Sequence, residues 1–364
     1  MGSHAEMSRR EFLRLAAFAA SGMGVAVLLP GCAPQATPTP MVAGAGMVDT
    51  TKYKKNSPWL IGRAGCGDTN EWMVSFSAHF EWKFKEVYKD LVKDYLVTAA
   101  NWDPVKQISD VEDLLAKNIN LLVIDPVSEA AIAGTVEICM ESGIPVILAS
   151  TRVQTDKYVS WVTTDNTRTG FITGDWLCKK LNGKGKVVIT MGAPGSSYAA
   201  EWLGGTRQAF AQYPEIQEVG VAYCYWSAVE AKKAMEAFLQ KDPDIAGVCP
   251  GGGQMGIGVI QAFLDAKKPL PPIGGADDGN GWMRVAKETG VDFIGSTSGS
   301  PMAAYVADIA IQVLKGQPVP KYVEYPTDWI YPKDLDKLYR PDLNENYIAS
   351  TLLPEAWINK LYKK

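Results

Sequence analysis

The sequence predicts an α/β protein with two doubly wound parallel sheets in tandem. From Trp59 onward, short β-rich runs alternate with helical patterns, the order typical of βαβ units. A second series of the same kind begins near Asp165. About 310 residues follow the N-terminal segment, and a length of this size favours two domains.

The first series contains strand candidates and one long helix candidate. The strands are expected at 59–64, 96–100, 121–125 and 144–149. Segment 71–95 carries apolar side chains at spacings of three and four, which predicts an amphipathic helix. This stripe consists of Trp72, Phe76, Phe80, Phe84, Val87, Leu91 and Tyr95.

The second series has the same organisation. Strands are expected at 186–191, 219–224, 245–249 and 272–276, and helices at 168–181, 198–212, 228–240 and 254–266. Right-handed crossovers place every strand-to-helix loop at the carboxyl edge of its sheet, where open α/β sheets bind ligands. These loops combine hydroxyl, amide and carboxylate side chains with tryptophans. Such a mixture suits a ligand with polar edges and an apolar face, for example a pyranose or a polyol.

Composition and charge exclude several classes of partner and chemistry. The net charge is −4, and no dense basic block follows Arg14, which argues against a nucleic-acid partner. Of the two histidines, His4 precedes the apolar N-terminal stretch, and His79 fits a core position in the first helix. Histidine-based triads and zinc sites are therefore disfavoured, and we expect no metal and no cofactor. Apart from Cys32, the cysteines lack C-x-x-C spacing and are expected to be small core residues.

The N-terminal segment indicates export. Arg9 and Arg10 precede an apolar stretch at 15–29, and about fifteen such residues are too few for a permanent membrane span, which needs roughly 20. The paired arginines resemble a twin-arginine export signal. Leu29-Pro30-Gly31-Cys32 resembles a bacterial lipobox, with Cys32 as the acylated residue, although Pro30 is unusual there. The alternative is an ordinary cleaved signal with a chance cysteine. Residues 1–32 are thus assigned to the signal and 33–57 to a tether.

Ordered motifs across the chain carry a family resemblance. They are Asn70-Glu71-Trp72, Leu121-Leu122-Val123-Ile124-Asp125-Pro126, Gly143-Ile144-Pro145-Val146-Ile147, Thr164-Asp165-Asn166, Gly274-Gly275-Ala276-Asp277 and Val313-Leu314-Lys315-Gly316. In this order and spacing, residues 58–330 resemble the ribose-binding-like (type I) periplasmic binding proteins of sugar ABC importers.

The resemblance implies two lobes joined by a three-segment hinge, with crossings near Thr163, Gly299 and Asp328. Lobe 1 would comprise 58–163 and 299–328, and lobe 2 would comprise 164–298 and 329–364. The family's function implies a monomeric, non-enzymatic solute-binding lipoprotein that captures a monosaccharide or polyol and delivers it to an ABC permease. Such a protein would contact the membrane only through its lipid anchor, on the extracytoplasmic side.

The resemblance also implies a set of ligand-binding residues. Carried over by position, they are Asn70, Trp72, Asp125, Ser150 and Arg152 from lobe 1, and Glu201, Trp226, Gly252 and Asp277 from lobe 2. Arg152 would hold two ligand oxygens, the aspartates would accept hydroxyl protons, and Trp72 and Trp226 would cover ring faces.

This chain departs from the sugar binders at three places. Gly252 and Gly253 stand where related proteins carry an Asn-Asp pair, and Glu201-Trp202 stands where they carry an arginine. The glutamine expected near Gly299 is missing. These departures predict a ligand other than ribose.

An exported NAD(P)-dependent oxidoreductase is the alternative from another class. Residues 251–256 satisfy the template G-x-G-x-x-G after a strand, and Asp277 follows about 20 residues later. Against this reading, Pro250 interrupts the join with the strand, and no histidine or tyrosine-lysine pair marks a hydride-transfer partner. A sugar-responsive repressor is disfavoured because an export signal replaces the helix-turn-helix. The sequence leaves open whether the closed protein docks a permease or a chemoreceptor.

Overall fold

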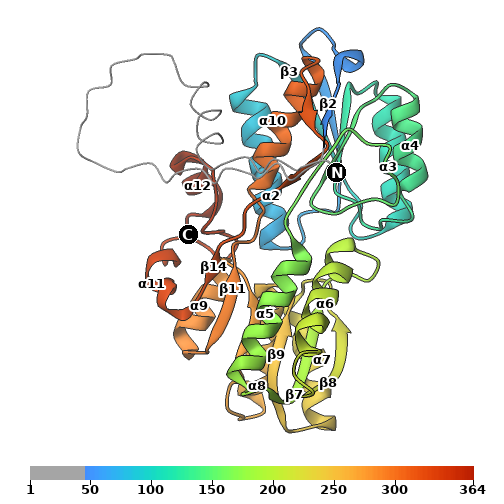
Figure 1. The fold of residues 1–364 in the computed structure, drawn as a ribbon. Coiled ribbons are helices and arrows are strands. Elements are labelled where there is room, and N and C mark those ends of the chain that lie inside the picture. The colour runs from blue at the N-terminus through green and yellow to red at the C-terminus, as the bar shows by residue number, and fades with distance from the viewer. Residues whose placement is uncertain (1–45) are drawn as a thin grey trace, which may run out of the picture. The chain divides into compact units, whose positions relative to one another are not determined.

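The computed structural model describes residues 46–364. The predicted export signal, Cys32 and residues 33–45 of the expected tether lie outside the described residues. The described chain contains two six-stranded sheets and one short antiparallel pair. Each large sheet, together with the helices that cover it, forms one lobe (Figure 1).

Lobe 1 is built on a fully parallel sheet with the strand order β13-β6-β5-β4-β2-β3. Helices α2 and α10 pack on one face of this sheet, and α3 and α4 pack on the other. The strands are β2 (Trp59–Gly65), β3 (Val92–Ala99), β4 (Leu121–Ile124), β5 (Val146–Ala149), β6 (Ser160–Thr163) and β13 (Tyr322–Glu324). The helices are α2 (Glu71–Trp82), α3 (Pro104–Ala116), α4 (Ala133–Glu141) and α10 (Met302–Leu314).

Lobe 2 has the order β14-β11-β10-β9-β7-β8, in which only β14 runs antiparallel to its neighbour. Helices α5 and α6 cover one face, and α7, α8 and α9 cover the other. The strands are β7 (Lys184–Met191), β8 (Glu215–Tyr223), β9 (Ile245–Pro250), β10 (Ile273–Ala276), β11 (Phe293–Ser296) and β14 (Trp329–Ile330). The helices are α5 (Asn166–Lys180), α6 (Ser197–Phe210), α7 (Ala228–Lys241), α8 (Gly253–Asp265) and α9 (Asn280–Thr289).

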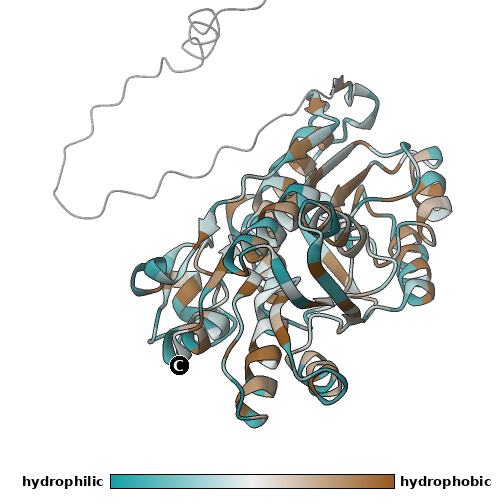
Figure 2. Ribbon diagram, turned by 60° about the horizontal axis from the view of Figure 1, so that its bottom comes forward, coloured by the Kyte–Doolittle hydropathy of each residue, from teal (hydrophilic) through white to brown (hydrophobic). Residues whose placement is uncertain are grey.

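The central strands are buried on both faces, which explains their continuous apolar sequences. Every residue of β4 (LLVI) and of β5 (VILA) is buried. Parallel strands covered by helices on both sides need no polar alternation. The surrounding helices change between brown and teal along their length, as helices with a single apolar face do (Figure 2). The predicted fold class, two doubly wound parallel-sheet lobes, is confirmed.

The chain passes between the two sheets in three connections. These are the segments from β6 to α5, from β11 to α10 and from β13 to β14. The boundaries 58–163 with 299–328 and 164–298 with 329–364 remain our proposal for the two lobes.

The helix predicted at 71–95 is shorter in the structure. α2 is followed by a π-helical turn, η3 (Lys83–Val87), and β3 already begins at Val92. Tyr95 nevertheless packs against Phe80 and Phe84, with ring centroids 6.2 and 5.0 Å apart. A strand residue that shares the core of the helix therefore extended the apparent helical stripe.

Part of the expected tether is folded onto lobe 1. β1 (Met47–Val48) pairs antiparallel with β12 (Val319–Pro320), and the 3-10 turn η2 (Thr51–Tyr53) follows it. Tyr53 is buried in the lobe 1 core. The correction concerns residues 47–53, where Tyr53 is buried in that core and Val48 packs against it.

The C-terminal segment contacts both lobes. It contains the 3-10 turn η4 (Pro332–Asp334), α11 (Leu335–Leu338) and α12 (Glu355–Tyr362). Trp357 and Tyr362 belong to an apolar cluster that includes Ala78 of α2 in lobe 1. On the other side, Asn280 of α9 in lobe 2 donates to the Leu343 carbonyl at 3.0 Å. The segment thus bridges the lobes.

The remaining sequence expectations concern core residues and membrane spans. His79 is fully buried, and burial lowers its pKa to about 4, so it is neutral. Its Nε2 accepts the Leu352 amide at 3.0 Å. Cysteines 66, 139, 178, 224 and 249 are buried and unpaired. Across residues 46–364, no helix combines the length and hydropathy that a membrane crossing requires.

Candidate ligand-binding site

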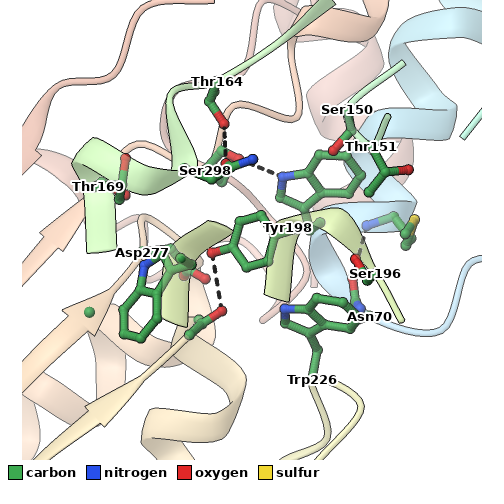
Figure 3. A pocket seen from close by; sticks show the side chains of 18 of the residues that line it. Asn70, Ser150, Thr151, Thr164, Thr169, Ser196, Tyr198, Trp226, Asp277 and Ser298 are labelled. Atoms are coloured by element: carbon green, nitrogen blue, oxygen red, sulfur yellow. Dashed lines mark hydrogen bonds between the residues drawn. The ribbon is translucent and has the colours of Figure 1, made fainter. Parts of the chain in front are cut away.

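A cavity lies between the lobes, at the carboxyl ends of their strands (Figure 3). It encloses about 990 Å³ of empty space, including its opening to solvent. Its lining is drawn from both lobes and from the connections between them. From lobe 1 come Cys66, Asn70, Trp72, Met73, Trp102, Asp125, Pro126, Ser150, Thr151 and Met302; from lobe 2 come Asn166, Thr169, Thr173, Ser196, Tyr198, Trp202, Trp226, Gly251, Gly252, Gly275, Ala276, Asp277 and Ser296; the connections supply Thr164, Thr297, Ser298 and Thr327.

Most of the residues predicted from sequence line this cavity. Those brought together are Asn70, Trp72, Asp125, Ser150, Trp226, Gly252 and Asp277. Arg152 and Glu201 lie outside the lining, and their contact with ligand stays a prediction. Arg152 pairs with Glu129 at 2.7 Å and approaches Glu201 at 3.6 Å. Whether the seven lining residues contact ligand stays a prediction.

The first turn of α2 positions two of the lining residues. Asn70 caps the helix, because its side chain accepts the Met73 amide at 3.0 Å. Trp72 stacks on Phe76 with centroids 4.5 Å apart, and its indole N–H donates to the Ser298 carbonyl. The indole is thereby held between lobe 1 and a connection, with its position set by both.

Hydroxyl groups dominate the polar part of the lining. The hydroxyl of Thr151 donates to the Pro126 carbonyl at 2.8 Å, and that of Tyr198 donates to the Gly251 carbonyl at 3.3 Å. Ser196 differs, because its buried Oγ has no hydrogen-bond partner among residues 46–364. A buried hydroxyl without a partner costs free energy unless something binds it. The Ser196 hydroxyl is therefore available to a bound ligand.

Asp277 is held by the backbone of its own lobe. Its Oδ2 accepts the Gly253 amide at 2.7 Å and its Oδ1 accepts the Gly279 amide at 3.0 Å. Burial raises the pKa of Asp277 to about 6, while the two amide donors act in the opposite direction. Each oxygen retains lone-pair capacity for a ligand hydroxyl.

Asp125 forms a buried ion pair with Arg63 of β2, which the sequence interpretation did not include. Arg63 Nε lies 3.1 Å from Oδ1, and the Cys66 amide donates to Oδ2 at 3.0 Å. Both charged residues are almost fully buried, at 1% and 2% exposure. The Arg63 guanidinium also packs against Phe76, 5.0 Å from the ring centroid. Asp125 therefore holds lobe 1 together, whatever it contributes to ligand.

No lysine, arginine or histidine among residues 46–364 lines the cavity. The charged groups of the lining are the carboxylates of Asp125 and Asp277. A phosphate or carboxylate needs cationic or multiple amide donors when it leaves water. The cavity is therefore suited to an uncharged polar ligand.

The two lobes touch across the cavity. Trp102, which follows β3, stacks on Trp226, which follows β8, with centroids 4.9 Å apart and planes at 27°. The Arg152 amide of lobe 1 donates to the Ser197 hydroxyl of lobe 2 at 3.0 Å. The structure is thus a closed arrangement of the lobes.

Comparison with known proteins agrees with this geometry. A model of the periplasmic binding protein domain matches residues 64–318. This chain is a type I periplasmic binding protein. It is 31% identical over 211 residues to a ribose import binding protein of Bacillus subtilis (strain 168), covering 58% of this chain and 67% of that protein.

Two further comparisons fit the same family. A xylitol-binding protein of Mycolicibacterium smegmatis is 27% identical over 231 residues, covering 62% of this chain and 66% of that protein. Each of these two alignments thus spans about two thirds of the length of the related protein. An ABC transporter solute-binding protein from Thermobispora bispora has the same fold, with a TM-score of 0.74 at 23% identity, covering 79% of this chain and 90% of that one.

The glycine-rich motif at 251–256 serves this binding protein as a turn into α8. Gly251 and Gly252 line the cavity, and the Gly253 amide at the start of α8 donates to Asp277. A dinucleotide would place its pyrophosphate at such a helix start. Here the Asp277 carboxylate occupies the amide and would repel the phosphate charge. The comparisons with known proteins likewise give the oxidoreductase alternative no support.

Several lining residues of the periplasmic binding protein escaped sequence reasoning. Trp102 follows β3, at the end of the strand predicted at 96–100. Ser196 lies in the loop after β7, and Tyr198 lies at the start of α6. Their position after a strand was the one sequence signal that could have identified them as lining residues. The sequence does not show in which direction their side chains point.

Proposed function

We propose that this periplasmic binding protein captures one small uncharged sugar or polyol in the cavity between its lobes and delivers it to an ABC importer. Proteins of this family bind solutes for transport and are not enzymes. The observation that carries the proposal is a cavity lined by hydroxyl groups and tryptophans, to which residues 46–364 contribute no basic side chain.

The chemistry of the lining supports this ligand class. Sugars and polyols offer hydroxyl groups that can both donate and accept, so they match a lining of hydroxyls and carboxylates. The unpaired Ser196 hydroxyl could both donate to and accept from a ligand hydroxyl, and the carboxylate of Asp277 would accept from another. The free face of Trp72 would cover the apolar side of a ring. The relatives named for ribose and xylitol fall in the same class.

Ribose itself is the less favoured member of that class. Gly252 replaces a side chain that could reach a sugar hydroxyl, and it lies beneath Trp226, whose Cδ1 would be 3.3 Å from an added Cβ. Glu201 is engaged by Asn166 at 3.0 Å and lies outside the cavity lining. Lobe 2 therefore offers few side chains with two hydrogen-bonding atoms. A small, highly hydroxylated pentose would use more of them.

A thermal-shift panel tests the ligand class. A protein comprising residues 46–364 would be screened with D-ribose, D-fructose, xylitol and myo-inositol, with ribose 5-phosphate and NAD as charged controls. A ligand at 100 times its Kd adds about 2.7 kcal/mol to the stability of the folded state, so at least one neutral compound should raise Tm by several degrees. Ribose 5-phosphate should have no effect because none of the described residues that line the cavity is cationic. Stabilisation by NAD alone would contradict the proposal.

The membrane attachment is a separate proposal that rests on the N-terminal sequence. We infer that the protein is exported by a twin-arginine signal, acylated at Cys32 and held as a monomer at the extracytoplasmic face of the membrane. The lipobox-like segment 29–32 supports the acylation, and Arg9 and Arg10 support the export route.

Intact-protein mass spectrometry of the membrane fraction tests the anchor. The N-terminal residue should be Cys32, carrying the mass of its acyl chains. The variant C32A should leave the membrane fraction, because a tether without lipid has no means of membrane attachment. An unmodified N-terminus upstream of Cys32 in the membrane-bound protein would refute the assignment.

A further inference from the structure

We propose that Trp102 is a ligand-retaining residue: together with Trp226 it forms a two-part cover, the tryptophan gate, that sets how fast bound ligand leaves the cavity. The inference rests on the proposed function and extends it to a residue and a kinetic role. It starts from the one aromatic stack that joins the two lobes across the cavity among residues 46–364.

The two tryptophans occupy equivalent places in their lobes. Trp102 follows β3 and precedes α3, and Trp226 follows β8 and precedes α7. β3 and β8 are each an edge strand that pairs with the first strand of its sheet. Both side chains line the cavity and are partly buried. The gate is therefore contributed equally by the two lobes and exists only when they meet.

The backbone of both loops is unusual in the same way. Asn101 and Trp102 have φ values of 52° and 66°, and Tyr225 and Trp226 have φ values of 51° and 54°. Two successive left-handed residues form a type I′ pattern, which favours asparagine and glycine. A bulky aromatic residue in this conformation is strained. The same costly conformation in both loops is accounted for if it serves to turn the two indoles toward each other.

The surroundings keep each indole in place. The Trp102 N–H donates to the Thr69 hydroxyl at 3.1 Å. Trp226 lies directly on Gly192, where an added Cβ would come within 2.0 Å of its ring, and Tyr198 lies beside it at 5.9 Å. Because the indoles stack on each other, no ligand ring fits between them. Their role is to cover the ligand, and opening the lobes must break the stack first.

Ligand dissociation from Trp102 variants tests the gate. D-ribose, D-fructose, xylitol and myo-inositol would each be loaded and displaced in a stopped-flow experiment. W102A should raise the dissociation rate on the order of tenfold and leave the association rate within about threefold, because losses at a closed interface fall mainly on dissociation. W102F keeps an aromatic face and should restore most of the wild-type rate. The matched control is W176A, which removes a partly buried tryptophan of α5 away from the cavity.

The double variant W102A/W226A separates a pair from two independent contacts. If the indoles act on each other, the double variant should dissociate no faster than the quicker single variant. Multiplicative effects, or an unchanged dissociation rate in W102A, would overturn the gate while leaving sugar capture intact. If none of the four compounds binds the wild-type protein, the proposed function and the gate fail together.

Discussion

Replacing Asp125 with alanine should lower the free energy of unfolding by about 3–5 kcal/mol, the cost typical of stranding one member of a buried ion pair. Arg63 would lose a partner at 3.1 Å while remaining 1% exposed. Its remaining side-chain hydrogen bond, to the Ser77 hydroxyl at 2.7 Å, cannot neutralise a charge. Urea unfolding followed by circular dichroism gives the free energy directly.

Two variants distinguish the buried charge from a general loss of contacts. In R63M/D125L the charge is absent, so stability should return to within about 1 kcal/mol of wild type or exceed it. R207A removes an exposed arginine, about half accessible, from its pair with Glu218, and should cost less than about 1 kcal/mol. A D125A loss as small as that of R207A would show that Arg63 reaches water. Because Asp125 supports the lobe, reduced sugar affinity in D125A would not prove ligand contact.

The protein should become less stable as pH rises, because rising pH ionises Glu71. This residue is a buried carboxyl group at the contact between the lobes. Glu71 is 4% exposed, and its Oε2 has no hydrogen-bond partner in the described part of the chain. Its Oε1 lies 3.3 Å from the position of a Cβ added to Gly279 in lobe 2. Burial, followed by the charges of Asp277 and Asp278, raises the pKa of Glu71 to about 8, and Gln254 acts against this.

The direction of the pH effect follows from proton linkage. The folded, closed protein keeps the Glu71 proton up to about pH 8, whereas the unfolded chain releases it near 4.5. The stabilisation is therefore complete below pH 4.5 and is lost progressively as pH rises toward 8. Within that window each pH unit costs up to about 1.4 kcal/mol. Opening the lobes also hydrates Glu71, so sugar affinity should weaken in the same window.

The isosteric variant E71Q isolates this group. Relative to the wild type, E71Q should gain stability steadily from pH 5 up to about pH 8, because glutamine carries no ionisable proton. E81Q, on the same helix with a side chain 43% exposed, should run parallel to the wild type at every pH. Urea unfolding at intervals of one pH unit from 5 to 9 measures both differences. A constant offset between E71Q and wild type would show that Glu71 does not titrate in this range.

Arg63 illustrates a partnership that sequence reasoning could have found. A single arginine inside the apolar strand WLIGRAG requires a buried carboxylate, and Asp125 directly follows the neighbouring strand β4. Parallel neighbours bring their carboxyl ends together, so the pair was within reach of the pattern. The sequence pattern instead predicts a ligand contact for Asp125, with a helix cap as its structural alternative.

Arg152 and Trp102 illustrate what sequence reasoning could not reach. Arg152 stands in a polar loop after a strand, as a ligand-binding arginine would, yet its side chain turns to Glu129 and Glu201. Glu201 comes from the other lobe. Trp102 meets Trp226, also from the other lobe, in a left-handed conformation that no sequence signal marks. Both outcomes depend on how the lobes close.

The amino-acid sequence alone was enough to predict the two parallel sheets and the edge at which ligand binds. Those features follow from local periodicity, strand-to-helix order and the handedness of crossovers, each of which spans a few tens of residues. Only the tertiary structure decided which polar side chains face the cavity, which pair with one another, and that Glu71 is buried near carboxylates of the opposite lobe. Such contacts join distant segments, and their geometry arises from the packing of whole lobes, which local patterns do not encode.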